Sequence, residues 1–272
     1  MTTDAERSAA SQQDTSTPGA APRAVTGEGR AREEAASKWV RGMFGGIARH
    51  YDLLNHLLSF NLDKRWRART VTRVADVLAR PRARVLDLCC GTGDILLSLD
   101  AVSGAHHNAL LLGSDFCHPM LVEASRKIAA QRNAQTRHLP LFEADALALP
   151  LAEDSLDLIT VAFGFRNLAN YHSGLIELRR ALKPGGVLAI LEFSQPTNRA
   201  FAALYNFFSA RVLPAIGGMI SGSREAYSYL PESIRKFPGA ERLADQMRAA
   251  GFSTVEFERM TFGAVALHLG TK

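Results

Sequence analysis

The 272-residue sequence predicts an α/β fold built on a doubly wound, mostly parallel sheet of seven strands whose last strand is antiparallel. Three observations support this prediction. Short apolar runs alternate with segments of helical period between residues 84 and 192. A glycine turn, Gly91-Thr92-Gly93, directly follows the first of these runs. Two alternating runs near the C-terminus, 254–259 and 264–269, flank a short loop and predict a closing hairpin.

The first 36 residues differ in composition from the rest of the chain. They are rich in Ala, Ser, Thr, Gln, Gly and charged residues, which bury too little apolar surface to fold, so we expect a disordered tail over 1–36. Residues 37–272 are expected to form one domain. Within it, the apolar helical segment at 198–237 contains Arg211 and Pro214, which make it too short and too broken to span a bilayer. We interpret 198–237 as a lid insertion over the ligand site.

A helical lead-in precedes the sheet. Apolar residues recur at steps of three and four from Trp39 to Leu58, with a break or a bend expected at Gly45-Gly46. A second helix begins at Asp63 and stops at Pro81. The expected strands then cover 84–88, 109–114, 139–144, 155–162, 187–192, 254–259 and 264–269, and the helices between them cover 92–102, 119–132, 171–182 and 242–250. Parallel sheets of this kind bind ligands at the carboxyl ends of the strands, where the sequence places Asp87, Asp115, Asp145 and Glu192.

The glycine turn lies between a buried strand and a helix N-terminus, where backbone N–H groups are free to bind a ligand. It differs from the dinucleotide fingerprint G-x-G-x-x-G, because Leu96 occupies the position of the third glycine. A carboxylate just before the turn, Asp87, repels a pyrophosphate but attracts a cationic amino-acid tail. The pattern therefore resembles the first motif of S-adenosylmethionine-dependent methyltransferases, with an ordinary tight turn as the alternative.

Two later strand ends support an adenosine ligand. Asp115 ends the next strand, where a carboxylate typically accepts hydrogen bonds from both ribose hydroxyls. Capping of the helix that begins near Pro119 is the alternative role for Asp115. At the third strand end, Asp145 can accept from the adenine amino group while the backbone of Ala146 reads the ring edge, and a plain loop acid is the alternative. All of these acids together, on successive strand ends, favour adenosine.

Composition and cysteine spacing argue against several classes of protein and of site. Hydrophobic residues make up 47% of the chain, and the net charge of +5 comes without a dense Lys/Arg block, so we expect no nucleic-acid partner. Of the three cysteines, the adjacent Cys89 and Cys90 form a poor disulfide pair, and no Cys/His spacing is typical of a metal site. The polar N-terminus lacks an apolar signal core. These features predict a reduced, cytoplasmic protein without a metal.

Four separated motifs make the resemblance specific. They are Tyr51-Asp52-Leu53-Leu54-Asn55-His56-Leu57-Leu58-Ser59 with Trp66 beyond it, Phe163-Gly164-Phe165-Arg166-Asn167, Arg180-Ala181-Leu182-Lys183-Pro184-Gly185-Gly186 continuing to Glu192-Phe193-Ser194, and Tyr227-Ser228-Tyr229-Leu230-Pro231-Glu232-Ser233-Ile234. From about Lys38 to the C-terminus the sequence resembles the ubiquinone/menaquinone biosynthesis C-methyltransferases. It departs from them at Leu54, Asp63 and Ala162, where that family usually has Met, His and Ser.

The resemblance implies a class I S-adenosylmethionine-dependent methyltransferase fold and C-methylation of a polyprenyl quinol. Conversion of demethylmenaquinol to menaquinol is the first choice, and methylation of the polyprenyl methoxybenzoquinol precursor of ubiquinone is the second. The resemblance implies that S-adenosylmethionine is held by Gly91, Thr92, Gly93, Asp115, Asp145 and Ala146. A lipid acceptor implies a transient contact between residues 201–220 and a membrane surface, and a homodimer is left open. A nicotinamide-dependent dehydrogenase and an inactive scaffold of the same fold are the alternatives from other classes.

Three residues are catalytic candidates under this resemblance. Arg166 is too basic to accept a proton, since an arginine pKa exceeds about 12, but it could stabilise a developing phenolate or orient a water. Tyr51 could hydrogen-bond the quinol oxygen, and Asp52 could handle the proton. Structural roles are the alternatives: Asp52 could position a helix, and Arg166 could pair with Asp52 or Glu192 and hold the lid.

Overall fold

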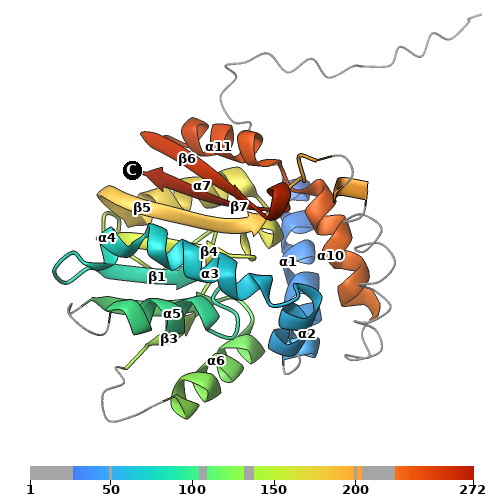
Figure 1. Cartoon of the computed structure of the whole chain (residues 1–272), viewed down its shortest axis with the longest axis horizontal. Helices are drawn as coiled ribbons and strands as arrows, with labels where there is room; N and C mark the ends of the chain where they lie inside the picture. The colour runs from blue at the N-terminus through green and yellow to red at the C-terminus, as the bar shows by residue number, and fades with distance from the viewer. Residues whose placement is uncertain (1–26, 49–50, 104–108, 132–137, 199–200, 204–223) are drawn as a thin grey trace, which may run out of the picture.

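The computed structural model describes residues 27–272 except 49–50, 104–108, 132–137, 199–200 and 204–223. Its centre is a seven-stranded sheet in the order β3-β2-β1-β4-β5-β7-β6 (Figure 1). The strands are β1 Arg84–Leu88, β2 Leu110–Asp115, β3 Leu141–Glu143, β4 Leu156–Ala162, β5 Leu182–Phe193, β6 Thr254–Met260 and β7 Val265–Thr271. Strands β1 to β5 are parallel, and β7 pairs antiparallel with both β5 and β6. The predicted sheet and its closing hairpin are confirmed.

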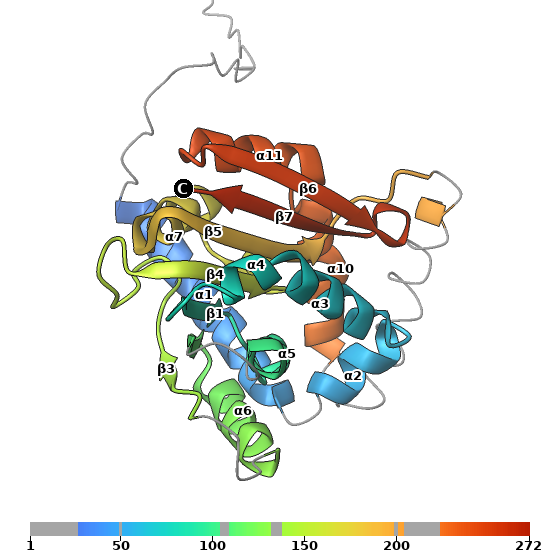
Figure 2. The same cartoon turned by 60° about the vertical axis from the view of Figure 1, so that its left-hand side comes forward.

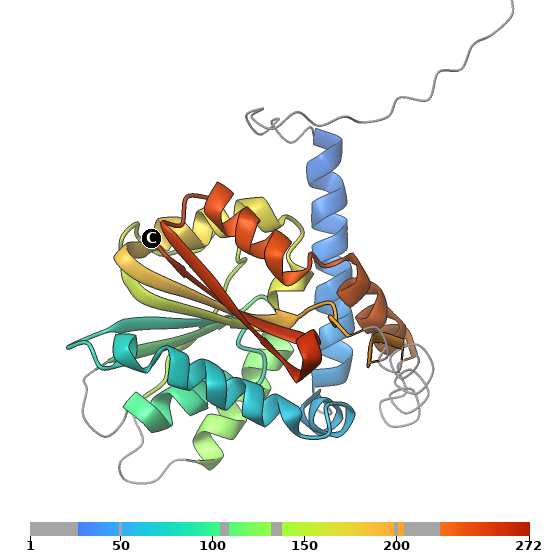
Figure 3. The ribbon, with the colours of Figure 1, turned by 45° about the horizontal axis from the view of Figure 1, so that its top comes forward.

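Helices cover both faces of the sheet (Figure 3). One face carries α3 Leu62–Arg73, α4 Ala75–Leu78, α5 Asp94–Ser103 and α6 His118–Ala130, and the other carries α7 Tyr171–Ala181 and α11 Ala240–Ala249. The central strands are mostly apolar because they are buried on both sides. In β1, for example, Val85 and Leu86 have no exposed surface and Leu88 exposes 1%. This packing fixes the strand ends that form the site.

Three further helices stand at the carboxyl edge of the parallel strands. They are α1 Gly27–Ile47, α2 Tyr51–Leu58 and α10 Arg224–Lys236 (Figures 1 and 3). The β6–β7 hairpin also projects at this edge, with the short helix η4 Thr261–Gly263 at its tip (Figure 2). The edge that binds ligands in this class of sheet is therefore surrounded by elements from both ends of the chain.

Helix α1 corrects two expectations. It begins at Gly27, so residues 27–36, which composition assigned to a disordered tail, are helical; residues 1–26 lie outside the described part of the chain. Good helix formers such as Ala, Glu and Arg dominate 27–36 and extend a helix that tertiary packing anchors. The helix also runs through Gly45-Gly46 without the predicted break. A Cβ on Gly45 would lie 3.5 Å from Cγ of Pro119, an ordinary van der Waals distance, which shows that this part of α1 packs against α6.

Strand β5 is longer than predicted. It begins at Leu182, directly after α7, so residues 183–186 belong to the strand instead of a separate loop. Leu156 pairs with Leu182 and Leu158 pairs with Val187, which shows that the four residues between bulge out of the ladder. Gly185 within the bulge has φ of +75°, a backbone conformation that disfavours other residues.

The predicted lid insertion, 198–237, is described in part. Residues 224–236 form α10, whereas 204–223 lie outside the described residues, and with them lies most of the apolar stripe that supported the lid hypothesis. The division into tail, domain and lid therefore stays a proposal. Within the described ranges, no helix combines the length and apolar character needed to cross a membrane.

Candidate active site

The turn after β1 presents backbone N–H groups at the start of α5. Gly91 and Gly93 have φ of +55° and +87°, where a Cβ is strained. The N–H of Gly91 donates to Oδ2 of Asp115 at 2.9 Å, and the N–H of Cys117 donates to Oδ1 at 2.9 Å. Asp115 thus ties the turn to the end of β2. The N-cap residue of α6 is Cys117, so capping by Asp115, the alternative from the sequence, is not what the structure shows.

Two buried carboxylates lie beside this turn. Asp87, at 1% exposure, accepts a hydrogen bond from Thr160 Oγ1 at 2.7 Å through Oδ1, while its Oδ2 has no hydrogen-bond partner among the described residues. Burial raises the pKa of Asp87 to about 7. Burial also raises the pKa of Asp115, against the lowering effect of backbone hydrogen bonds from Cys117, Gly91 and Phe116. An incompletely paired buried carboxylate gains most from a cationic partner, so Asp87 fits the ammonium of an amino-acid tail.

A solvent-open cavity lies at the carboxyl edge of the sheet and encloses about 690 Å³ when the open solvent at its mouth is included. Four predicted cofactor residues line it together: Gly91, Asp115, Asp145 and Ala146. A smaller space of about 360 Å³ meets it at Gly91 and is lined by Asp87 and Thr92. The structure therefore brings the predicted cofactor residues to one place, with Gly93 shaping the turn beneath them.

Sequence analysis missed one wall of this cavity. Ser37 and Phe44 line it from α1, and Asn167 lines it from the loop after β4. Arg41 of the same helix pairs with Glu143 at 3.6 Å on the surface. The helical spacing of Trp39, Val40 and Phe44 was a visible signal for a helix, but nothing in that spacing indicated which surface the helix covers.

Tyr51 lies over the glycine turn and lines both spaces. Its ring is 3.8 Å from the point where a Cβ on Gly91 would lie, and it contacts the ring of Phe44 edge-on, with 6.0 Å between centroids. Burial raises the pKa of the Tyr51 hydroxyl, against the lowering effect of Arg166. The hydroxyl is therefore protonated at neutral pH and can donate a hydrogen bond to a ligand in the cavity.

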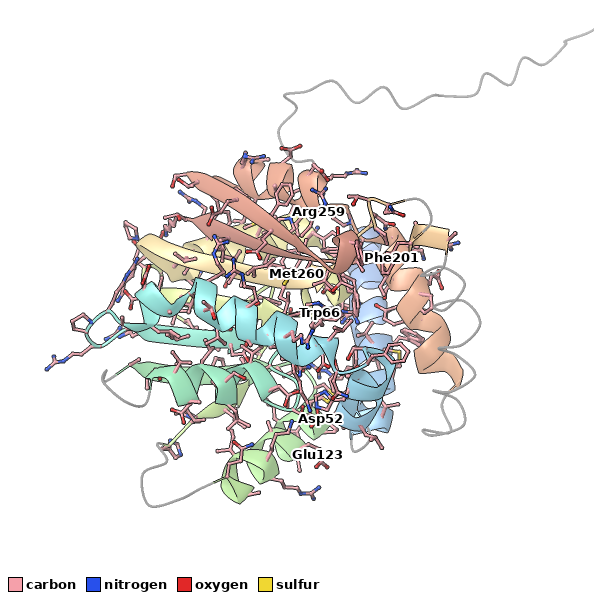
Figure 4. The ribbon with its side chains drawn as sticks, in the orientation of Figure 1. Asp52, Trp66, Glu123, Phe201, Arg259 and Met260 are labelled. Atoms are coloured by element: carbon pink, nitrogen blue, oxygen red, sulfur yellow. The ribbon has the colours of Figure 1, made fainter. Side chains whose placement is uncertain are left out.

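Asp52, the residue after Tyr51, points to the glycine turn. Its Oδ1 accepts a hydrogen bond from the Thr92 hydroxyl, and its Oδ2 forms an ion pair with Lys127 of α6. Figure 4 shows Asp52 between α2 and α6. Because Asp52 is bound on both oxygens to the protein itself, this geometry favours the helix-positioning alternative over proton handling.

Arg166 lies in the short helix η2 Phe165–Asn167 and is 7% exposed. Its Nη1 donates to Oε1 of Glu192 at 2.9 Å, and its backbone N–H donates to Oε2 of Glu192 at 3.1 Å. Its guanidinium lies 5.3 Å from the centroid of the Phe193 ring. Burial lowers the pKa of Arg166, but Glu192, Tyr51 and Tyr229 together raise it above its ordinary value. The predicted pairing with Glu192 is present, and the catalytic role of Arg166 stays a prediction.

A roof over this region joins three distant segments. The Tyr229 hydroxyl of α10 donates to Oδ1 of Asn167 at 3.1 Å, and the rings of Trp39 and Tyr229 meet edge-on with centroids 5.1 Å apart. Burial raises the pKa of the Tyr229 hydroxyl. Helices α1 and α10 and the loop after β4 thus meet above the site, and Tyr229 serves this closure.

Comparisons with known proteins agree with the geometry. A sequence model of the ubiE/COQ5 methyltransferase family matches residues 31–272. The chain is 49% identical over 231 residues to a demethylmenaquinone methyltransferase of Thermus thermophilus, which covers 85% of this chain and 100% of that protein. It is 42% identical over 232 residues to a ubiquinone/menaquinone biosynthesis C-methyltransferase UbiE of Syntrophotalea carbinolica, covering 85% of this chain and 93% of that protein.

Solved structures share the fold at low sequence identity. A SAM-dependent methyltransferase of Thermotoga maritima superposes with a TM-score of 0.54 at 18% identity, covering 84% of this chain and 99% of that chain. A protein of Methanococcus maripaludis, named as a putative S-adenosyl-L-methionine-dependent methyltransferase, gives a TM-score of 0.55 at 15% identity, covering 83% of this chain and 91% of that chain. The architecture is that of class I methyltransferases.

Proposed function

The chain belongs to the ubiE/COQ5 methyltransferase family, and from this premise we propose that it transfers a methyl group from S-adenosylmethionine to a ring carbon of demethylmenaquinol. The observation that carries the proposal is the identity of 49% to a demethylmenaquinone methyltransferase over that protein's whole length. Membership of an enzyme family removes the support for a dehydrogenase or an inactive scaffold. The UbiE relative keeps the ubiquinone precursor as second candidate, since its name covers both quinones.

The residues of the site fit S-adenosylmethionine. The free Oδ2 of Asp87 suits the ammonium of the methionine part. Asp115 already accepts two backbone hydrogen bonds, but each carboxylate oxygen has two lone pairs, so it can accept from the ribose hydroxyls as well. Asp145 is held by the N–H of Leu147 at 2.9 Å and stands next to the buried Ala146, where the adenine would lie. When bound, the cofactor supplies an electrophilic methyl group on a sulfonium.

The chain's own residues position the acceptor for attack. The Tyr51 hydroxyl, protonated because burial raises its pKa, donates to the quinol oxygen and orients the ring above the glycine turn. Phe44 and Phe163 supply apolar walls that exclude water from the reacting carbon. The ring carbon gains the methyl group as the bond between that group and sulfur breaks, and the proton on this carbon passes to water in the solvent-open cavity. Arg166, near Tyr51, stabilises the developing phenolate charge of the quinol.

Product analysis with two rival acceptors tests this function. The purified protein, supplied with S-adenosylmethionine, should methylate demethylmenaquinol on carbon and form S-adenosylhomocysteine in equal amount. The ubiquinone precursor should react more slowly. Tight S-adenosylmethionine binding without turnover of either quinol would contradict the proposal, and faster turnover of the ubiquinone precursor would move it to the second candidate.

The lipid acceptor supports a transient contact with a membrane surface. Phe207 and Phe208, in the predicted contact 201–220, lie outside the described residues. In the described part of that segment, the ring of Phe201 packs on Phe262 with centroids 5.1 Å apart, and Phe262 is 70% exposed at the hairpin tip. Figure 4 shows Phe201 and the hairpin residue Met260 at the same edge of the sheet. We place Phe262 in the proposed contact.

Replacing Phe262 with serine should weaken membrane association. Full burial of a Phe side chain is worth about 1.5–3 kcal/mol, so partial insertion of this ring predicts a loss of about three- to tenfold in co-sedimentation with anionic vesicles. Ile176→Ser is the matched control, because Ile176 is 47% exposed on α7. Equal sedimentation of wild type and Phe262→Ser would remove the hairpin tip from the contact.

A further inference from the structure

We propose that Lys127 is a positioning residue of the acceptor site, which acts through Asp52 to hold Tyr51 over the glycine turn. The inference rests on the proposed function, because it gives Tyr51 the role of binding the acceptor. Lys127 lies near the end of α6, outside the residues that line the two spaces described above, and no sequence motif pointed to it.

The Lys127 ammonium sits among three oxygen acceptors. Its Nζ donates to Oδ1 of Asp94 at 2.6 Å and to the Thr92 hydroxyl at 3.2 Å, and it forms an ion pair with Oδ2 of Asp52. The Thr92 hydroxyl in turn donates to Oδ1 of Asp52. One lysine thus joins the first turn of α2 to the glycine turn and to the N-terminus of α5. We call these four residues the α2 clamp.

A second set of contacts fastens the other end of α2. Asp94 also accepts from Arg67 at 2.9 Å through Oδ2, and Arg67 donates to Asp63 at 2.7 Å. Asp63 pairs with His56 at 2.7 Å, and the hydroxyl of the residue after α2, Ser59, donates to it at 2.6 Å. Helix α2 is therefore held at both ends by polar contacts that converge on Asp94.

This arrangement makes the place of Tyr51 depend on Lys127. Asp52 directly follows Tyr51, so fixing both carboxylate oxygens of Asp52 fixes the backbone that carries the tyrosine. Without the Lys127 ammonium, the carboxylates of Asp52 and Asp94 would lose the cation that lies between them. The repulsion between the two carboxylates would then push α2 away from the glycine turn. The side chains of Lys127 and Asp94 are each 23% exposed, so water can relieve part of this repulsion and the domain should stay folded.

Lys127→Met should therefore impair use of the acceptor more than binding of the cofactor. We expect kcat/KM for the quinol to fall about tenfold, since small misplacements of an orienting group cost one to two orders of magnitude. Affinity for S-adenosylmethionine by calorimetry should change less than about threefold, and Lys127→Arg should recover most of the rate. Arg126→Met is the control: Arg126 is adjacent on α6 but pairs with Glu123 of its own helix, so the same charge is lost outside the clamp.

Two measurements decide whether Lys127 acts through α2 and Tyr51. Hydrogen exchange needs no acceptor: amides 51–58 should exchange faster in Lys127→Met than in wild type or Arg126→Met, and unchanged exchange would overturn the inference even if the protein methylated no quinol. In a Tyr51→Phe background, Lys127→Met should lower kcat/KM by less than about twofold, since the group that it positions is gone. Full additivity of the two substitutions would overturn the inference and leave the proposed function standing.

Discussion

Asp115→Ala is expected to weaken the binding of S-adenosylmethionine by at least about tenfold, because a hydrogen bond to a charged group is worth on the order of 1.5–3 kcal/mol. The structure adds a second reason. The same carboxylate accepts the N–H groups of Gly91 and Cys117, so its loss also releases the glycine turn from the end of β2. Calorimetry on the folded variant measures the effect directly.

A neighbouring acid provides the control for this prediction. Glu143 lies opposite Asp115 in the β2–β3 register, but its side chain is 40% exposed and pairs with Arg41 and His118 at the surface. Glu143→Ala should leave the affinity within about twofold of wild type, since exposed ion pairs contribute little. If Asp115→Ala kept full affinity while its melting temperature showed an intact fold, the ribose assignment would be wrong.

The parts of the site that the sequence predicted depend on short-range signals. A run of apolar residues that must be buried on both faces defined β1 at its observed bounds, Arg84 and Leu88. The glycines, which adopt positive φ, predicted the position of the turn. The acids at successive strand ends line one cavity because parallel strands end at the same edge of the sheet. These features can be recognised from the local sequence, without knowing which distant segments of the chain are in contact.

The contacts that the sequence did not predict join residues far apart in the chain. Tyr229 contacts Trp39 and Asn167 in the roof, and Lys127 pairs with Asp52 in the clamp. The helical spacing of apolar residues shows that one face of a helix must be buried, but it does not show which element packs against that face. Charged residues pair across the fold without any periodic signal, so Lys127 resembled an ordinary surface lysine. The run of α1 through Gly45-Gly46 has the same origin, because packing against α6 outweighed local propensity.

Arg166→Ala is expected to cut turnover by about a hundredfold or more, as loss of one preorganised electrostatic donor commonly does. Affinity for S-adenosylmethionine should stay nearly unchanged, since the stabilised charge develops only in the transition state. Arg166→Lys should recover only part of the rate, because a point charge cannot replace both the Nη1 contact to Glu192 and the cation–π contact of the guanidinium with Phe193. Steady-state kinetics beside calorimetry separate these effects.

The ion pair between Arg166 and Glu192 means that Arg166→Ala changes stability as well as the charge near the acceptor. Glu192 is 1% exposed, so removing its partner leaves a buried unpaired carboxylate, and breaking such a pair commonly costs about 3–5 kcal/mol. A marked fall in melting temperature is therefore expected in Arg166→Ala whether or not the guanidinium takes part in catalysis. Lost activity in this variant alone does not distinguish a catalytic cation from a residue that holds the loop after β4.

A double substitution separates the two roles of Arg166. Arg166→Met together with Glu192→Gln removes the cation and the unpaired charge at once, and replacing both partners of a buried pair is often nearly neutral for stability. We expect this variant to regain most of the lost melting temperature and to remain about a hundredfold slow, because the guanidinium of Arg166 no longer stabilises the phenolate beside Tyr51. Recovery of the rate in step with the melting temperature would show instead that Arg166 only holds Glu192 and the loop, leaving Tyr51 to orient the acceptor.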